Sequence, residues 1–141
     1  MPRDNVEVVR DYVESLAQAS PADVPGLIAR FCDPQSDYYP VQKFPESRPC
    51  HGLEDITHFV SEFFGAWDEF DYGIEAVTAV ADDRVLVRTR LSGTGRGSGL
   101  DMVGQVFICF WLRNGLVFRQ EDHLTLAGAR TALGLADVDL L

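Results

Sequence analysis

Residues 84–124 read RVLVRTRLSGTGRGSGLDMVGQVFICFWLRNGLVFRQEDHL, and this stretch decides which fold the sequence predicts. It contains three segments rich in β-branched and aromatic residues, which are typical of strands. The glycine-rich segment 92–99 separates the first two. Asn114-Gly115, the preferred pair for a two-residue hairpin loop, separates the last two. The pattern predicts three consecutive antiparallel strands in one sheet.

The rest of the chain supplies helices and one more long strand. Helical and alternating periodicities predict, in order, helices over about 4–19 and 20–33, a short strand at 37–39, an irregular loop over 40–51, a helix over about 52–67, a strand over 69–80, and a short final helix that ends at Gly134. We therefore expect an α+β fold in which helices pack on one face of the sheet. The 141 residues predict one domain, 1–141, with a core over about 4–135.

Composition excludes several classes of function. The net charge of −10 argues against nucleic-acid binding, which needs a basic surface. The longest apolar run, Val106–Leu112, is far shorter than the roughly 20 residues of a membrane-spanning helix. The first residues lack the apolar core of a signal peptide, so we expect a cytoplasmic protein. Cys32, Cys50 and Cys109 have no metal-ligand spacing, which predicts free thiols, no metal and no cofactor.

The register of the last hairpin assigns its side chains to faces. A two-residue loop pairs Arg113 with Leu116 and therefore Phe107 with Asp122. Burial beside that ring would raise the pKa of the Asp122 carboxyl and favour a role in proton transfer. The alternative is a strand-end carboxylate that accepts from a backbone amide. His123 then points to the opposite face, so the two side chains do not form a direct dyad.

The strand before this hairpin has two apolar faces. Val106, Ile108, Phe110 and Leu112 point to one side, and the residues between them point to the other. Since helices in so short a chain would cover only one face, we expect the other to be buried in a homodimer.

Five short motifs, in this order along nearly the whole chain, resemble the SnoaL-like families of the nuclear transport factor 2 superfamily. They are Phe44-Pro45-Glu46, His51-Gly52, Gly95-Arg96-Gly97-Ser98-Gly99, Leu112-Arg113-Asn114-Gly115 and Ala132-Leu133-Gly134-Leu135. The resemblance implies a cystatin-like α+β roll: a cone-shaped, curved antiparallel sheet with about three helices on its concave face and a pocket between them.

The resemblance also implies roles for individual residues. Asp122 follows Gly115 by seven residues, where polyketide cyclases and limonene-type epoxide hydrolases place a catalytic aspartate. Tyr12 resembles the first-helix tyrosine of ketosteroid isomerases. The isomerase general base would fall at Tyr39 and its second donor near Cys109, so steroid isomerisation is not expected.

The candidate site therefore has three catalytic positions and an apolar wall. The catalytic candidates are Asp122, Tyr12 and His123, where Tyr12 is either a donor or a core-edge tyrosine and His123 is either catalytic or a surface or interface histidine paired with Glu121 or Arg119. The residues expected to bind the substrate are Tyr39, Phe59, Phe63, Trp67, Phe107, Cys109, Trp111, Phe118 and Gln120.

Two classes of function fit these residues. The first is a cofactor-independent cyclase, isomerase or lyase that uses an aspartate general base on an apolar polyketide- or terpenoid-like ligand. Oxyanion donors would come from Tyr12, Tyr39 or Gln120. The second is a non-catalytic ligand-binding or dimeric assembly module. An Asp122 carboxylate open to a cavity favours the first class, and one held by backbone amides favours the second.

Overall fold

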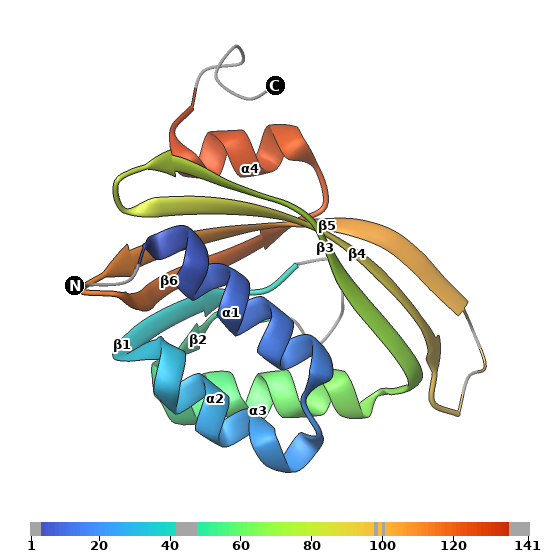
Figure 1. The fold of residues 1–141 in the computed structure, drawn as a ribbon. Coiled ribbons are helices and arrows are strands. Elements are labelled where there is room, and N and C mark those ends of the chain that lie inside the picture. Colours follow the sequence, from blue (N-terminus) through green and yellow to red (C-terminus); the bar gives the residue numbers. More distant parts are fainter. Residues whose placement is uncertain (1–3, 42–47, 98, 100, 136–141) are drawn as a thin grey trace.

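The structure, a computed structural model, describes residues 4–41, 48–97, 99 and 101–135 (Figure 1). Its elements are α1 (Asn5–Gln18), η1 (Pro21–Asp23), α2 (Val24–Phe31), β1 (Cys32–Tyr39), β2 (Cys50–His51), α3 (Gly52–Gly65), β3 (Trp67–Ala81), β4 (Arg84–Gly95), β5 (Asp101–Arg113), β6 (Leu116–His123) and α4 (Leu126–Leu133). The predicted α+β fold is confirmed. Ser98 and residues 42–47 of the loop expected over 40–51, which include Phe44-Pro45-Glu46, lie outside the described residues. Cys50 and His51, at the end of that expected loop, instead form β2.

Helix α1 shows how the local sequence forms the elements. The Asp4 carboxylate accepts a hydrogen bond from the Val6 backbone N–H at 2.8 Å and so caps the helix. Val9, Tyr12 and Val13 are spaced three and four residues apart, and all three are buried. This stripe faces the concave side of the sheet, where helices α1, α2 and α3 lie (Figure 1).

The sheet has six strands in the order β2-β1-β6-β5-β4-β3. The four long strands expected to be antiparallel neighbours, β3 to β6, are antiparallel neighbours. Strand β1 is parallel to β6 and pairs Tyr38 with Gln120. The pattern had not predicted this parallel pairing. Strand β4 also runs into the glycine-rich segment as far as Gly95, where the sequence favoured a flexible connection.

The hairpin between β5 and β6 has the predicted two-residue loop. Asn114 and Gly115 have φ angles of 54° and 76°, the left-handed conformations that this kind of turn needs. Arg113 pairs with Leu116, as expected. The register then changes within three residues of the turn.

A β-bulge at Phe118 displaces the rest of β6 by one position. Leu112 pairs with Val117 and Trp111 pairs with Arg119, so Phe118 has no partner on β5.

The predicted pairing of Phe107 with Asp122 is therefore wrong. Asp122 pairs with Ile108, and Phe107 pairs with His123. Because a shift of one residue exchanges the two faces of a strand, the bulge places Asp122 on the concave face.

The core has two parts, one on each face of the sheet. The main cluster lies on the concave face and includes Val87, Ile108 and Phe110 together with α1 and α2. A smaller cluster on the outer face joins Phe107 and Cys109 to α4. The expectation that helices cover only one face is corrected, since α4 packs on the other (Figure 1). Among the described residues, no helix is long and apolar enough to cross a membrane.

Candidate functional site

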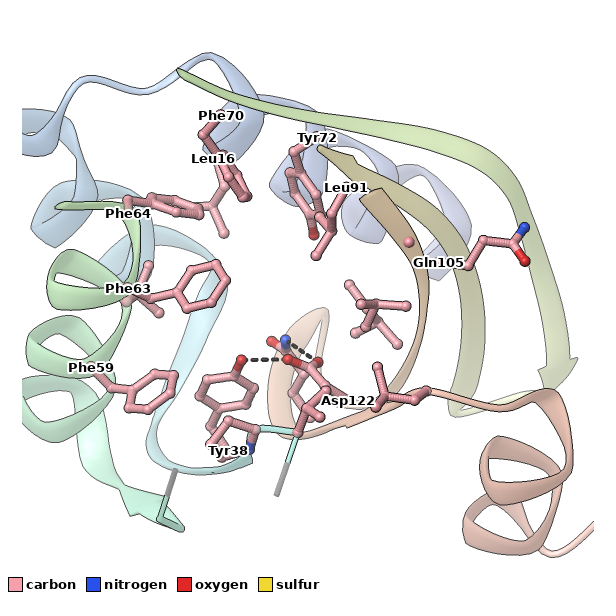
Figure 2. A pocket seen from close by; sticks show the side chains of 18 of the residues that line it. Leu16, Tyr38, Phe59, Phe63, Phe64, Phe70, Tyr72, Leu91, Gln105 and Asp122 are labelled. Atoms are coloured by element: carbon pink, nitrogen blue, oxygen red, sulfur yellow. Dashed lines mark hydrogen bonds between the residues drawn. The ribbon is translucent and has the colours of Figure 1, made fainter. Parts of the chain in front are cut away.

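A cavity of about 300 Å³ lies between helices α1 and α3 and the concave face of the sheet (Figure 2). Its wall is mostly aliphatic and aromatic, and its polar side chains are few. The lining residues are Tyr12, Leu16, Tyr38, Pro40, Val41, Ile56, Phe59, Val60, Phe63, Phe64, Phe70, Tyr72, Leu91, Val103, Gly104, Gln105, Val106, Ile108, Gln120, Asp122 and Leu124. Val103 and Leu124 are 69% and 41% exposed, which places apolar side chains at the rim.

Among the described residues that line the cavity, Asp122 supplies the only acidic group. Its Oδ2 accepts a hydrogen bond from the Tyr38 hydroxyl at 2.5 Å, and its Oδ1 accepts from the Gln120 side-chain amide at 3.1 Å (Figure 2). The parallel pairing of β1 with β6 brings Tyr38 beside this carboxylate. A carboxylate has about four acceptor positions. Two side-chain donors therefore leave capacity for a ligand, and no described backbone amide donates to this group.

Burial in the apolar cavity raises the pKa of the Asp122 carboxyl from 3.8 to about 6. The hydrogen bonds from Tyr38 and Gln120 and the nearby His123 act in the opposite direction, because they stabilise the charged form. The carboxyl group is thus mostly ionised at pH 7 and is a stronger base than an ordinary aspartate.

Three tyrosines line the cavity together with this carboxylate. Burial raises the pKa of each phenol, Tyr12, Tyr38 and Tyr72, well above its ordinary value, and the charge of Asp122 contributes to all three. They are therefore neutral donors at neutral pH. The Cys32 thiol donates to the Tyr12 hydroxyl oxygen at 3.5 Å, which leaves the proton of that hydroxyl for another acceptor.

Five of the residues predicted for the site line the cavity: Asp122, Tyr12, Phe59, Phe63 and Gln120. The other seven do not: Tyr39, Trp67, Phe107, Cys109, Trp111, Phe118 and His123. Trp67 packs against Phe63 and Phe70, which line the cavity, with ring centroids 6.1 and 6.3 Å away.

Strand alternation explains the misplaced residues around β6. The Arg119 guanidinium lies 4.6 Å from the Tyr39 ring centroid and 5.3 Å from that of Trp111, so both rings belong to the outer face. Phe118, the bulge residue, packs against Arg113. The His123 ring nitrogen Nε2 lies 3.3 Å from a Glu121 carboxylate oxygen, which agrees with the non-catalytic alternative for this residue.

Phe107 and Cys109 are enclosed between the sheet and α4. The Arg88 guanidinium lies 5.7 Å from the Phe107 ring centroid, and the Cys109 thiol donates to the Ala129 carbonyl at 3.7 Å. Burial raises the pKa of Cys109 to about 12, so this thiol stays protonated. All three cysteines are free, as predicted.

Sequence reasoning missed Tyr38 and Tyr72. Tyr72 belongs to the alternating apolar side of β3, and this pattern could have indicated it. Tyr38 and Tyr39 are adjacent, and only the pairing of β1 with β6 decides which of them faces the cavity. In the described part of the chain, no group of three or more histidine, cysteine, aspartate or glutamate side chains could hold a metal ion.

The curved sheet, three helices on its concave face and the apolar cavity between them define the cone-shaped α+β class of nuclear transport factor 2-like proteins. The family model of the SnoaL-like domain matches residues 9–120. The chain therefore belongs to the SnoaL-like family, as its motifs predicted. No curated protein matches the sequence.

Solved structures share the fold at low sequence identity. A provisionally assigned SnoaL-like polyketide cyclase from Jannaschia sp. CCS1 has a TM-score of 0.74 and 21% identity, covering 96% of this chain and 94% of that one. An NTF2-like protein from Burkholderia thailandensis E264 has a TM-score of 0.75 and 22% identity, covering 90% and 97%. TerC, co-crystallised with polyporic acid, has a TM-score of 0.71 and 14% identity, covering 94% and 99%. These likenesses support the fold alone.

Proposed function

We propose that this protein is an acid–base enzyme that removes a proton from the carbon next to a carbonyl group in a small cyclic ligand. The observation that carries the proposal is the Asp122 carboxylate, which lines an apolar cavity and has a pKa of about 6. A general base works best when its pKa lies near the working pH. Two side-chain donors fix the position of this base.

The chemistry needs no further reactant. Asp122 accepts the proton, and the electrons of the C–H bond move toward the carbonyl oxygen, giving an enolate. The Tyr12 hydroxyl and the second N–H of the Gln120 amide are the donors proposed for that oxygen. In a β,γ-unsaturated ketone, return of the proton from Asp122 to the γ-carbon of the conjugated enolate gives an isomer. In a ligand with a second carbonyl group, attack of the enolate carbon on that group forms the ring bond, and the proton held by Asp122 passes to the new alkoxide.

The size and wall of the cavity define the ligand class. Ligand pockets measure about 300–1,000 Å³, and this cavity lies at the lower end of that range. Phe59, Phe63, Phe64 and Phe70 supply ring faces to the wall. We therefore propose a flat, apolar, polyketide- or terpenoid-like ligand with one or two rings. The co-crystallisation of TerC with polyporic acid supports small-molecule binding by a protein of this fold.

Deuterium exchange into 1-tetralone, a bicyclic ketone with one methylene next to its carbonyl, tests the proposal without knowledge of the natural substrate. The protein is expected to accelerate exchange in D₂O, with a rate that rises through a midpoint near pH 6 as Asp122 loses its proton. The Tyr38→Phe variant removes a donor that lowers the pKa of Asp122, so its midpoint should move to higher pH. Mass spectrometry of the ketone follows the rate.

The outcome separates the two functional classes. Binding of 1-tetralone without acceleration of exchange would contradict the enzyme proposal and favour a ligand-binding protein. An exchange rate with no inflection between pH 5 and 7 would show that a group other than Asp122 acts as the base.

We also propose that the protein is a homodimer formed through the outer face of the sheet. Support comes from Tyr39, Trp111 and Phe118, half-buried aromatic residues outside the cavity on or beside this face. Sedimentation equilibrium should give about twice the mass of 15.7 kDa. The Trp111→Glu variant should shift the equilibrium toward the monomer, and a monomeric wild type would contradict the proposal.

A further inference from the structure

The Tyr72 hydroxyl is a polar group of the cavity that has no hydrogen-bond partner among the described residues. Tyr72 lies on β3, and its ring stacks against that of Phe70 with centroids 6.0 Å apart. Figure 2 shows its hydroxyl pointing into the cavity from the wall opposite Asp122. No described residue forms a hydrogen bond with it, whereas the hydroxyls of Tyr38 and Tyr12 each have a partner.

A hydroxyl that faces an apolar space costs free energy unless it finds a partner. A ligand oxygen in the cavity would satisfy this group. The phenol is neutral, since burial and the charge of Asp122 raise its pKa, and it can therefore donate its proton to an acceptor.

Gly104 leaves open space in the same row of the sheet. Tyr72 pairs with Leu91, and Leu91 pairs with Gly104. Strand alternation puts Gly104 on the cavity face, as it does Val106. A Cβ atom added at Gly104 would meet nothing within 4 Å. The wall that carries Tyr72 therefore has space for a ligand atom beside Leu91, at the position of Gly104.

We infer that Tyr72 and Gly104 form a distal subsite that binds a second oxygen atom of the ligand, remote from the carbon that Asp122 deprotonates. This inference rests on the proposed function for the identity of the reacting end. Tyr72 is then a specificity-determining residue, and the substrate class narrows to small cyclic ketones with a further acceptor oxygen on the far ring. Phe63, Phe64 and Phe70 hold the rings between the two polar ends.

A matched pair of probes tests this subsite. The ketone 6-methoxy-1-tetralone carries an acceptor oxygen on the ring away from its carbonyl, and 6-ethyl-1-tetralone replaces that oxygen with carbon at similar size. Wild-type protein should bind the methoxy compound more tightly. In the Tyr72→Phe variant, the ratio of the two affinities should fall about two- to tenfold, which corresponds to one neutral hydrogen bond. This variant should bind the ethyl compound as the wild type does. Calorimetric titration measures both affinities.

The control is Tyr39→Phe, which removes a phenol outside the cavity and should leave the preference unchanged. A second variant, Gly104→Val, should weaken binding of both probes while the protein stays folded, because a Cβ atom added there meets nothing within 4 Å and valine favours strands. Retention of the methoxy preference by Tyr72→Phe, or unchanged affinities in Gly104→Val, would overturn the subsite.

The exchange assay separates this inference from the proposed function. With 6-methoxy-1-tetralone, Tyr72→Phe should raise KM and leave kcat nearly unchanged, since the hydroxyl contacts a non-reacting part of the ligand. Loss of the methoxy preference in a protein that never catalyses exchange would support the subsite and contradict the enzyme proposal. Exchange that depends on Asp122, with the methoxy preference retained in Tyr72→Phe, would support the enzyme proposal and contradict the subsite.

Discussion

Replacing Asp122 by Asn is expected to lower the rate of deuterium exchange in 1-tetralone by about 10²–10⁴-fold, the usual contribution of general acid–base catalysis. Asparagine has the same shape and can still accept the hydrogen bond from Gln120, but it cannot accept a proton at neutral pH. The affinity for the ketone should therefore change little. Comparison of kcat with the dissociation constant measures the two effects separately.

Asp71→Asn provides the matched control for this substitution. Asp71 lies on β3, is exposed and does not line the cavity with Asp122. Its variant should exchange the ketone at the wild-type rate. Equal rates for wild type and Asp122→Asn would remove the chemical basis of the proposed function.

The same Asp122→Asn variant is expected to be more stable than the wild type at pH 7. The pKa of this carboxyl is about 6 in the folded protein and 3.8 in its ordinary state, so folding disfavours the ionised form. A difference of about 2 pH units corresponds to at most about 3 kcal/mol of unfolding free energy. Urea denaturation monitored by circular dichroism measures the gain.

The pH dependence identifies the cause of this gain. Below pH 3.8 both states of the wild type hold the proton, and the penalty is absent. The penalty grows as the pH rises from about 4 to about 6 and is constant above that range. The stability advantage of Asp122→Asn should therefore be largest at pH 7 and small at pH 4. An advantage that is equal at both pH values would show that burial of the charge is not its source.

A buried carboxylate that lowers the free energy of unfolding is typical of residues retained for function. Asp122 differs in this respect from Asp55, a helix-start carboxylate whose pKa is lowered chiefly by hydrogen bonds from Arg48 and the His51 backbone. The environment of Asp55 favours its charge, whereas that of Asp122 opposes it.

Local signals in the sequence were sufficient to predict the first helix and the two-residue turn of the last hairpin. Asn114-Gly115 predicted the hairpin because few other pairs tolerate two positive φ angles. Helical spacing of Val9, Tyr12 and Val13 predicted the first helix and its buried face. These features depend on residues close in sequence, and the structure agrees with them.

The faces of the last hairpin could not be predicted in the same way. Phe118 sits in a bulge that no local pattern required, and it reverses the face of every later residue of β6. Phe107 was therefore assigned to the cavity wall and instead lies under α4. Tyr38 was missed for a similar reason, since its contact with Asp122 depends on strands about 80 residues apart in sequence.

The bulge also means that the number of residues in β6, and not the type of residue at the bulge, decides which face of the sheet carries Asp122. Any side chain at position 118 keeps Asp122 on the inner face, provided that the extra residue remains in the strand. Deleting it would carry the carboxylate to the outside of the cone, beside α4, with every other residue unchanged. Among related sequences, the count of residues between the hairpin glycine and this aspartate is therefore a better guide to shared chemistry than the identity of the residues between them.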